Sequence, residues 1–195
     1  NEALTISDTS IDASSLNTLD ENTTGTINAS AITTLSGSYA ALNTSYDSSG
    51  ISGLGNEAIT VDSGTASVFE ANTLDALTSG VVTATITNND IASLDTLTGT
   101  GNAYTISVTD ASVSAASLNA LDSKTSVAVD VTSTTVTGAV SDINTAYDSS
   151  GISGLGNEAL TISDTSIDAS SLNTLDENTT GTINASAITT LSGSY

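Results

Sequence analysis

Apolar residues recur along this chain in units that are longer than one strand and much shorter than a domain. In the first unit an apolar residue is followed by others five, ten and thirteen positions later, at Ile6, Ile11, Leu16 and Leu19. This spacing, exact or with insertions, recurs in six successive units, which begin at Ile6, Ile27, Val61, Ile86, Val108 and Val131. Such internal repetition is typical of solenoid proteins.

The spacing within a unit predicts its elements. A step of five residues favours two short strands on either side of a corner, and the final i, i+3 pair favours one turn of helix, with Ser14 as its N-cap in the first unit. One short unit cannot bury its own apolar stripe, whereas stacked units bury a continuous column. We therefore predict a mainly β fold, a β-solenoid with two short strands and a short helical turn per rung and about six rungs per 156-residue period.

Two other repeat architectures share part of this pattern. Leucine-rich repeats have units of similar length, but their L-x-x-L-x-L-x-x-N phrase is missing from this sequence. An array of immunoglobulin-like sandwiches would also repeat strands, but its homologous units would be about 100 residues long. The absence of proline favours the solenoid, because each rung must donate backbone N–H groups to its neighbour.

A second, larger repeat sets the domain organisation. Residues 1–39 and 157–195 are identical and lie 156 residues apart. We interpret residues 1–156 as one full tandem repeat of six rungs and residues 157–195 as the start of the next identical repeat. Copies of itself, or further repeats of the same long chain, are therefore the expected partners. Two units are long because each contains YDSSGISGLGNE, at Tyr46–Glu57 and Tyr147–Glu158, and its Gly and Ser residues predict a loop that bulges from the rung.

Charge excludes several classes of partner. The chain has 22 acidic residues and a single basic one, Lys124, with a net charge of −21. A nucleic acid is excluded because nothing could neutralise its phosphates, and an anionic membrane surface would repel the chain. No apolar run is long enough for a membrane-spanning helix, so no membrane span is expected in this segment.

The sequence contains few residues of the types that serve in catalysis. The sequence has no His or Cys, and Lys124 lies in the turn-like phrase DSKTS. Asp20 and Glu21 could in principle serve as acid and base, but adjacent residues in one turn point apart. The glycine-rich GISGLG lacks the Lys and Ser/Thr of a phosphate-binding P-loop. We therefore predict that the protein is not an enzyme.

One glycine-rich phrase has the spacing of a calcium motif. SGLGNEAIT, at Ser52–Thr60, and SGLGNEALT, at Ser153–Thr161, follow the nonapeptide G-G-x-G-x-D-x-U-x with Ser for the first Gly and Glu for Asp. They are similar to the RTX repeats, whose calcium ions lie between successive nonapeptides, but here no second nonapeptide follows. Glu57 and Glu158 are therefore candidate calcium ligands. The alternative is a glycine-rich turn that leads into the next strand.

Two further polar positions recur in register. An amide or carboxylate follows the first helical leucine position in all six units, at Asn17, Asn43, Asn72, Asp95, Asn119 and Asn144, and we expect these side chains to bond backbone groups at a corner. A carboxylate follows three or four residues later in five of the units, at Asp20, Asp47, Asp75, Asp122 and Asp148. Rungs stacked at about 4.8 Å would align these acids in a repulsive column that needs cations. The five Asp residues, with Glu57 and Glu158, are thus the predicted calcium site.

The phrases SLNTLDENTTGTINAS, VVTATI, SVSAASLNALD and AYDSSGISGLGNEA resemble the giant repetitive cell-surface proteins of marine picocyanobacteria. The resemblance covers the whole chain and implies an extracellular or cell-surface location, a very long parent chain and a structural or adhesive role. We therefore expect a structural repeat of an extracellular filament, stalk or surface layer. The alternative is a repetitive adhesin module that binds surface glycans or another cell, although the aromatic residues are few and scattered for a sugar-binding platform.

Overall fold

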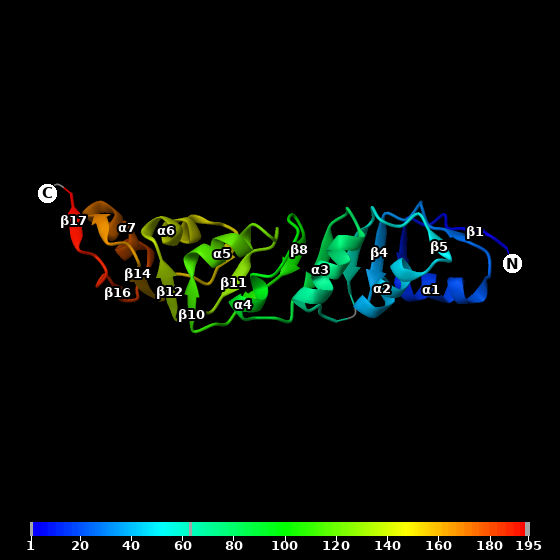
Figure 1. Ribbon diagram of the computed structural model, residues 1–195, viewed down its shortest axis with the longest axis horizontal. Helices are drawn as coiled ribbons and strands as arrows, with labels where there is room; N and C mark the ends of the chain where they lie inside the picture. The colour runs from blue at the N-terminus through cyan, green and yellow to red at the C-terminus, as the bar shows by residue number, and fades with distance from the viewer. Residues whose placement is uncertain (1, 63, 194–195) are drawn as a thin grey trace. The chain divides into compact units, whose positions relative to one another are not determined.

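The computed structural model describes residues 2–62 and 64–193, and its contacts divide the chain into two compact units. Unit 1 comprises Asn1–Thr87 and Leu97–Thr105, and unit 2 comprises Asn88–Thr96 and Ile106–Tyr195. Each unit alternates short helices with short strands along the chain (Figure 1).

Unit 1 has three helices and two parallel sheets among its described residues. The helices are α1 (Ala13–Asn22), α2 (Tyr39–Asp47) and α3 (Val68–Leu77). One sheet has the order β2 (Ser10–Asp12), β4 (Thr34–Gly37), β6 (Ala58–Val61), β7 (Val82–Thr85) and β8 (Ala103–Thr105). The other has the order β1 (Leu4–Thr5), β3 (Ile27–Asn28) and β5 (Ile51–Ser52). Ser10 pairs with Thr34, and Thr34 pairs with Ala58, so these successive rungs are offset by the same step along the sequence.

Unit 2 repeats this plan with four helices and three parallel sheets in its described part. The helices are α4 (Ile91–Leu94), α5 (Ala115–Asp122), α6 (Val140–Asp148) and α7 (Ala169–Asn178). The longest sheet has the order β10 (Ser112–Ser114), β12 (Thr135–Gly138), β14 (Ala159–Ile162) and β16 (Ile183–Asn184). The others are β13 (Ile152–Ser153), β11 (Val129–Val131) and β9 (Ser107–Val108), and the pair β15 (Ser166–Asp168) and β17 (Thr190–Ser192).

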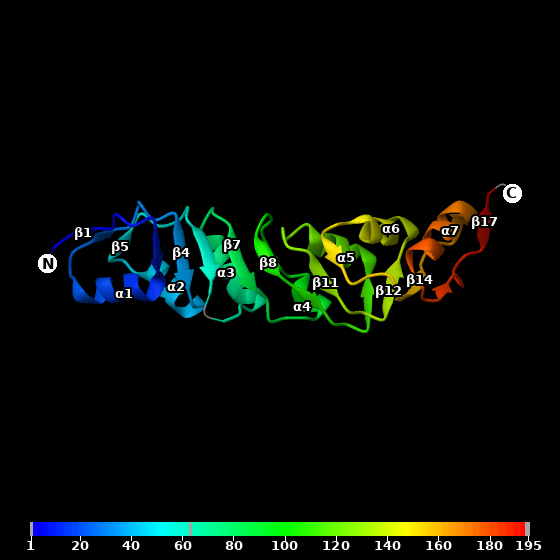
Figure 2. The same ribbon diagram turned by 180° about the vertical axis from the view of Figure 1, so that it is seen from behind.

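The core of each unit lies between its helices and its strands. In unit 1, Leu16 and Leu42 from successive helices and Leu35 and Ile59 from successive strands are fully buried. The corresponding buried residues of unit 2 are Leu118, Ile143, Leu175, Val113, Val136 and Leu160. Consecutive helices α1 and α2, and likewise α5 and α6, pack side by side, as the view from behind also shows (Figure 2). Each unit therefore has its own apolar core between its helices and its strands.

The prediction of a mainly β fold is wrong, because the chain is α/β, with about 31% helix and 28% strand. The phrases interpreted as one helical turn form helices of up to ten residues, such as α1 and α3. Side-chain caps fix where α1 and α3 begin. Asp12, not Ser14, caps α1 by accepting from the N–H of Ser15 and its neighbour, and Ser67 forms a capping box with Glu70 at α3.

The segments predicted to bulge as loops are also part of the stack. Strand β5 lies within Tyr46–Glu57 and pairs with β3, and β13 lies within Tyr147–Glu158 and pairs with β11. Ile51 is the Cα partner of Ile27, so the apolar residue of GIS continues the strand column. The two long sequence units therefore each contain an additional strand position.

No helix in residues 2–62 and 64–193 has the length and apolar composition needed to cross a bilayer.

Candidate functional site

The two copies of YDSSGISGLGNEA form the same closed loop in both units. Glu57 is 0% exposed, and its carboxylate accepts from the N–H of Gly55 at 2.9 Å, from the N–H of Asn56 at 3.1 Å and from the Tyr46 hydroxyl. The loop therefore folds around the carboxylate of its own glutamate.

The second copy reproduces these contacts. Glu158 is 1% exposed and accepts from the N–H groups of Gly156 and Asn157, at 2.8 and 3.0 Å, and from the Tyr147 hydroxyl. In both loops, both carboxylate oxygens accept hydrogen bonds from the protein. Such charge-assisted bonds to backbone N–H groups offset the cost of burying the charge.

Backbone conformation and burial both support this arrangement. Gly55 has φ +130° and Gly156 has φ +133°, a region that side chains disfavour, so glycine is needed where the N–H groups turn inward. Burial, together with the hydrogen bond and negative charge of Glu57, raises the pKa of Tyr46. Burial, together with the hydrogen bond and negative charge of Glu158, likewise raises the pKa of Tyr147. Both tyrosines therefore stay protonated and keep donating to the glutamates well above neutral pH.

The aspartates of the predicted calcium site make polar contacts with several different groups. Asp20 accepts from Ser48 Oγ at 2.6 Å, and Asp122 accepts from Ser149 Oγ at 2.8 Å, so each joins a helix to the rung that follows. Asp75 accepts from Asn102 Nδ2 at 2.7 Å, and Asp47 accepts from Asn43 Nδ2 within its own helix at 2.7 Å. The last aspartate, Asp148, ends α6.

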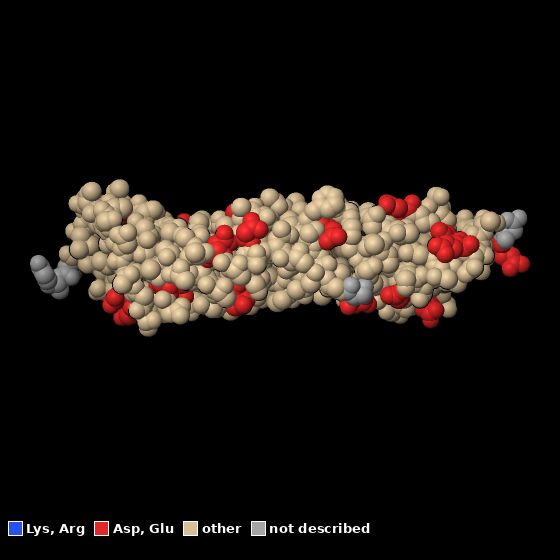
Figure 3. Space-filling view, turned by 90° about the horizontal axis from the view of Figure 1, so that it is seen from below, with Lys and Arg blue, Asp and Glu red and all other residues tan. Residues whose placement is uncertain are grey.

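The structure does not gather these acids into one cage. Among the described residues, no three Asp, Glu, His or Cys side chains lie close enough together to hold a metal ion. On the face shown in Figure 3, acidic side chains form small patches separated by uncharged surface. The seven candidate ligands therefore occupy separate places, and calcium binding stays a prediction.

The recurring Asn positions lie on helices, not at a corner as expected, and two of them, Asn17 and Asn119, bond the backbone of the next rung. Asn17 Nδ2 donates to Ala41 O at 2.9 Å, and Asn119 Nδ2 donates to Asp142 O at 2.9 Å. Both bonds run from one helix to the next, because Ala41 belongs to α2 and Asp142 to α6. These amides hold consecutive helices in register.

Two aspartates that the sequence analysis did not single out cap helices of another rung. Asp110 accepts from the N–H of Ile91 at 2.7 Å, at the start of α4, and Asp164 accepts from the N–H of Val140 at 2.8 Å, at the start of α6. The N-cap position of α6 is Ala139, which has no side-chain acceptor. The absence of a capping side chain at Ala139 was the one sign in the sequence that a residue from another segment would cap α6.

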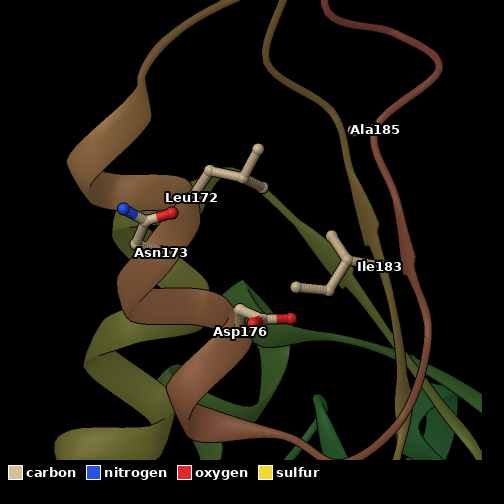
Figure 4. A pocket seen from close by; sticks show the side chains of 5 residues that line it. All are labelled: Leu172, Asn173, Asp176, Ile183 and Ala185. Atoms are coloured by element: carbon tan, nitrogen blue, oxygen red, sulfur yellow. The ribbon is translucent and has the colours of Figure 1, made fainter. Parts of the chain in front are cut away.

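An open groove lies in unit 2 between α7 and β16. It is lined by Leu172, Asn173, Asp176, Ile183 and Ala185. Figure 4 shows the Leu172 and Ile183 side chains directed into the space between the helix and the strand. Figure 4 also shows the Asp176 carboxylate directed into this space, so the groove has a mixed apolar and polar lining.

No family model, curated protein or solved structure matches this chain. The observations that bear on function are therefore its own contacts. These are rung-to-rung hydrogen bonds, buried loop carboxylates, and a groove at one edge of unit 2. The rung-to-rung bonds join one segment of the chain to another, and the buried carboxylates close the loops to which they belong.

Proposed function

We propose that this chain is a structural repeat of an extracellular filament, stalk or surface layer, built from successive repeats of one long chain or from copies of it. The observation that carries the proposal is that parallel strands pair from rung to rung in both units, with the paired residues 20 to 24 positions apart. Ser10 pairs with Thr34, Thr34 pairs with Ala58, and in unit 2 Thr135 pairs with Ala159, each by the same step along the sequence. A chain that repeats this step gains length with each rung by reusing the same contacts.

The polar chemistry of the described residues supports a structural role over catalysis. The carboxylates of Glu57, Glu158, Asp20 and Asp122 accept hydrogen bonds that close loops or join rungs. An acidic surface with a net charge of −21 suits solubility in salty surroundings and disfavours nucleic acid as a partner. Together with the resemblance to picocyanobacterial surface proteins, this supports an extracellular or cell-surface location and a non-enzymatic role.

The test is a series of chains with one, two and three 156-residue periods. We expect the melting temperature to rise with repeat number, because each added period covers an exposed end, and we expect length in electron micrographs to grow by an equal step. Equal melting temperatures, or particles that do not lengthen, would contradict the proposal. Specific binding on a glycan array would favour the adhesin alternative.

Calcium is proposed as a ligand of the acidic positions, and salt-dependent melting tests it. The chain is melted at fixed pH in EDTA at low salt, in sodium chloride, and in calcium chloride at the same ionic strength. Screening of the net charge of −21 predicts a higher melting temperature in both salts than in EDTA. A further rise with calcium supports a specific site, whereas equal curves in the two salts count against one.

A further inference from the structure

A polar pocket opens in unit 1 between two loops that follow successive helices. It is lined by Asp20 near the end of α1, by residues 23–26 of the loop that follows, and by residues 48–50 of the loop after α2. Apart from the Asp20 carboxylate, the lining consists of threonine, serine and glycine residues. The pocket therefore presents hydrogen-bonding oxygen atoms and one negative charge.

Contacts within the protein hold the Asp20 carboxylate in place and leave one of its oxygens available. Ser48 Oγ donates to Asp20 Oδ2 at 2.6 Å, and the N–H of Gly50 donates to Ser48 Oγ at 3.0 Å. Among the described residues, none donates a hydrogen bond to Asp20 Oδ1. A Cβ atom at position 50 would lie 2.1 Å from this oxygen, so glycine there keeps the approach to Asp20 Oδ1 open.

The lining faces solvent even where a neighbouring rung is present. Thr180, the counterpart of Thr24, is exposed although its N–H donates to Gly156 O of the rung before it at 2.9 Å. Ser150, the counterpart of Ser49, is exposed although α6 packs against α7 of the rung after it. The polar surface of the pocket is therefore a property of the rung and does not depend on a neighbouring rung being absent.

Charge and lining together select the class of ligand. The net charge of −21 and the Asp20 carboxylate disfavour an anion, and the hydroxyl-rich lining offers little contact area to an apolar group. An ammonium group has three donors and no acceptor, so it matches a carboxylate that is surrounded by hydroxyl oxygens. Lys124 is the single residue of the chain whose side chain carries an ammonium group.

Lys124 has a fixed backbone and no ion partner within its own chain. Its N–H donates to Leu121 O at 2.9 Å, and the N–H of Ser123 donates to Asn119 O at 3.3 Å, so the turn after α5 is held by the helix. The Lys124 side chain is half-buried. No carboxylate in the described part of the chain forms an ion pair with it, although the chain has 22 acidic residues.

We infer that Lys124 of one copy of the chain binds in the polar pocket of a second copy. Its ammonium group donates to Asp20 Oδ1 and to the hydroxyl oxygens of Thr26 and Ser49. The inference deepens the proposed function by naming a contact between neighbouring chains. It rests on that function only for the repetition that multiplies the contact.

The number of lysines matches the number of pockets. Residues 1–156 contain one lysine and one pair of loops with the residues of the pocket. In unit 2, Asp122 holds the place of Asp20, but Val127 and Ala128 stand where the pocket has glycine and threonine. One surface ion pair is weak. A chain that repeats the lysine and the pocket in every period makes many such contacts at once, which raises the overall affinity.

Carbodiimide cross-linking tests the inference, because this reagent joins an amine to a carboxylate where the two are in contact. Unlabelled and ¹⁵N-labelled chains are mixed in EDTA at low salt. Both carry D176N, which distinguishes Asp20 from its counterpart in the identical second block. We expect links between labelled and unlabelled chains that run mainly from Lys124 to Asp20.

Random collision predicts a different pattern of links. It would spread them over many acidic residues and favour fully exposed ones such as Asp47, because Asp20 is only half-exposed. The absence of links between chains would overturn the inference. Links that fall mainly on other acids would also overturn it, because the pocket would then belong to a different ligand.

A pair of variants separates the pocket from the charge of Asp20. T26V/S49A removes two hydroxyls of the pocket and keeps Asp20 and Ser48, so we expect unchanged circular dichroism and about a fivefold loss of the Asp20 link. The matched variant S15A/T83V removes two exposed hydroxyls elsewhere in unit 1 and should leave the link unchanged. Equal links in the two variants would overturn the inference.

Sedimentation of a three-period chain gives an independent readout. We expect self-association at low salt that K124A in every period abolishes, and association that K124A leaves intact would overturn the inference. The melting series with one, two and three periods does not depend on contacts between chains. Its success without an Asp20 link would reject the contact and leave the filament proposal intact, whereas an Asp20 link with constant melting temperatures would do the reverse.

Discussion

The rung containing α2 and the rung containing α6 have the same plan and the same closing loop, but they use different side chains to hold their helices. At the N-terminus of α2, Ser38 Oγ accepts from the N–H of Ala41 at 3.2 Å. At the same place in α6, Ala139 has no acceptor, and Asp164 of the following rung bonds the N–H of Val140. One helix is capped locally, whereas the other depends on its neighbour.

The same contrast appears at the helix-to-helix contact. Ser45 of α2 donates to Asn17 Oδ1 at 2.7 Å, so the oxygen and the nitrogen of that amide are both bonded. The residue in the place of Ser45 in α6 is Ala146, and no described residue donates to the buried Asn119 Oδ1. The loop with its buried glutamate is thus the constant part of the rung, while the helix contacts tolerate variation.

The largest effect is expected from removing the loop carboxylate. E57A leaves the N–H groups of Gly55 and Asn56 and the hydroxyl of Tyr46 without their acceptor, each at about 1–3 kcal/mol, so we expect a loss of about 3 kcal/mol or more. E158A should cost the same within about 0.5 kcal/mol if the loop is the constant part. Urea unfolding followed by circular dichroism measures both.

The isosteric variants E57Q and E158Q serve as controls, because the amide keeps one oxygen acceptor and the shape of the side chain. They should cost less than the alanine variants in both rungs. A large cost in one rung and none in the other would show that the loop, too, depends on its surroundings.

An intermediate effect is expected from alkaline pH. Burial raises the pKa of Tyr46, Tyr147 and Tyr104 in the folded protein, with further contributions from Glu57, Glu158 and Asp75 respectively. The unfolded tyrosine titrates near pH 10, so this stabilisation is present below about pH 10 and is lost above it as the unfolded state releases protons. The loss is at most about 1.4 kcal/mol per pH unit for each tyrosine.

Unfolding free energies at pH 8, 10 and 11 test this expectation. Y46F and Y147F should each make the alkaline loss shallower, and by similar amounts if the two loops are equivalent. A slope that neither variant changes would show that the alkaline loss does not come from these tyrosines.

The smallest effect is expected from exchanging the residues at the helix contact. S45A leaves Asn17 Oδ1 without its donor and should cost about 1 kcal/mol. A146S supplies a donor to Asn119 Oδ1 and should stabilise the protein by about 0.5 kcal/mol. Thermal or urea unfolding of the two variants measures the difference. Destabilisation by A146S would show that the space beside Asn119 cannot accept a hydroxyl.

The sequence pattern showed that short units repeat and located many of the buried apolar residues, because burial imposes the same requirement in every rung. It did not give the register of the units, since Ile27 pairs with Leu4 and Ile51 and not with Ile6 or Val61. The pattern also did not predict how much of the chain forms helix and how much forms strand. A single i, i+3 pair such as Leu16 and Leu19 does not define how far a helix extends, and the cap at Asp12 sets the start of α1. The strand at Ile51 was hidden among glycines and serines, because its partner, Ile27, lies a full rung earlier in the sequence.

The acidic positions were predicted less well for a similar reason. Composition and register located Glu57, Glu158 and the aspartates, but the bonds that use these acids depend on which backbone N–H or hydroxyl lies nearby in space. The Tyr46–Glu57 contact spans 11 residues and the Asp164–Val140 contact spans 24. From sequence alone, a carboxylate that recurs in a repeat can be interpreted as a metal ligand, because the sequence does not show which hydrogen-bond donors lie next to it in the folded chain.

Capping from the following rung has a consequence for how the chain emerges during synthesis or export. Val140 of α6 obtains its acceptor only when Asp164, 24 residues later, has appeared. At about 5–20 residues per second, that delay is about 1–5 s. Until Asp164 appears, α6 is less secured than α2, whose cap Ser38 precedes its helix in the chain. The start of α6 should therefore be a protease-sensitive point of any emerging chain that has not yet supplied Asp164.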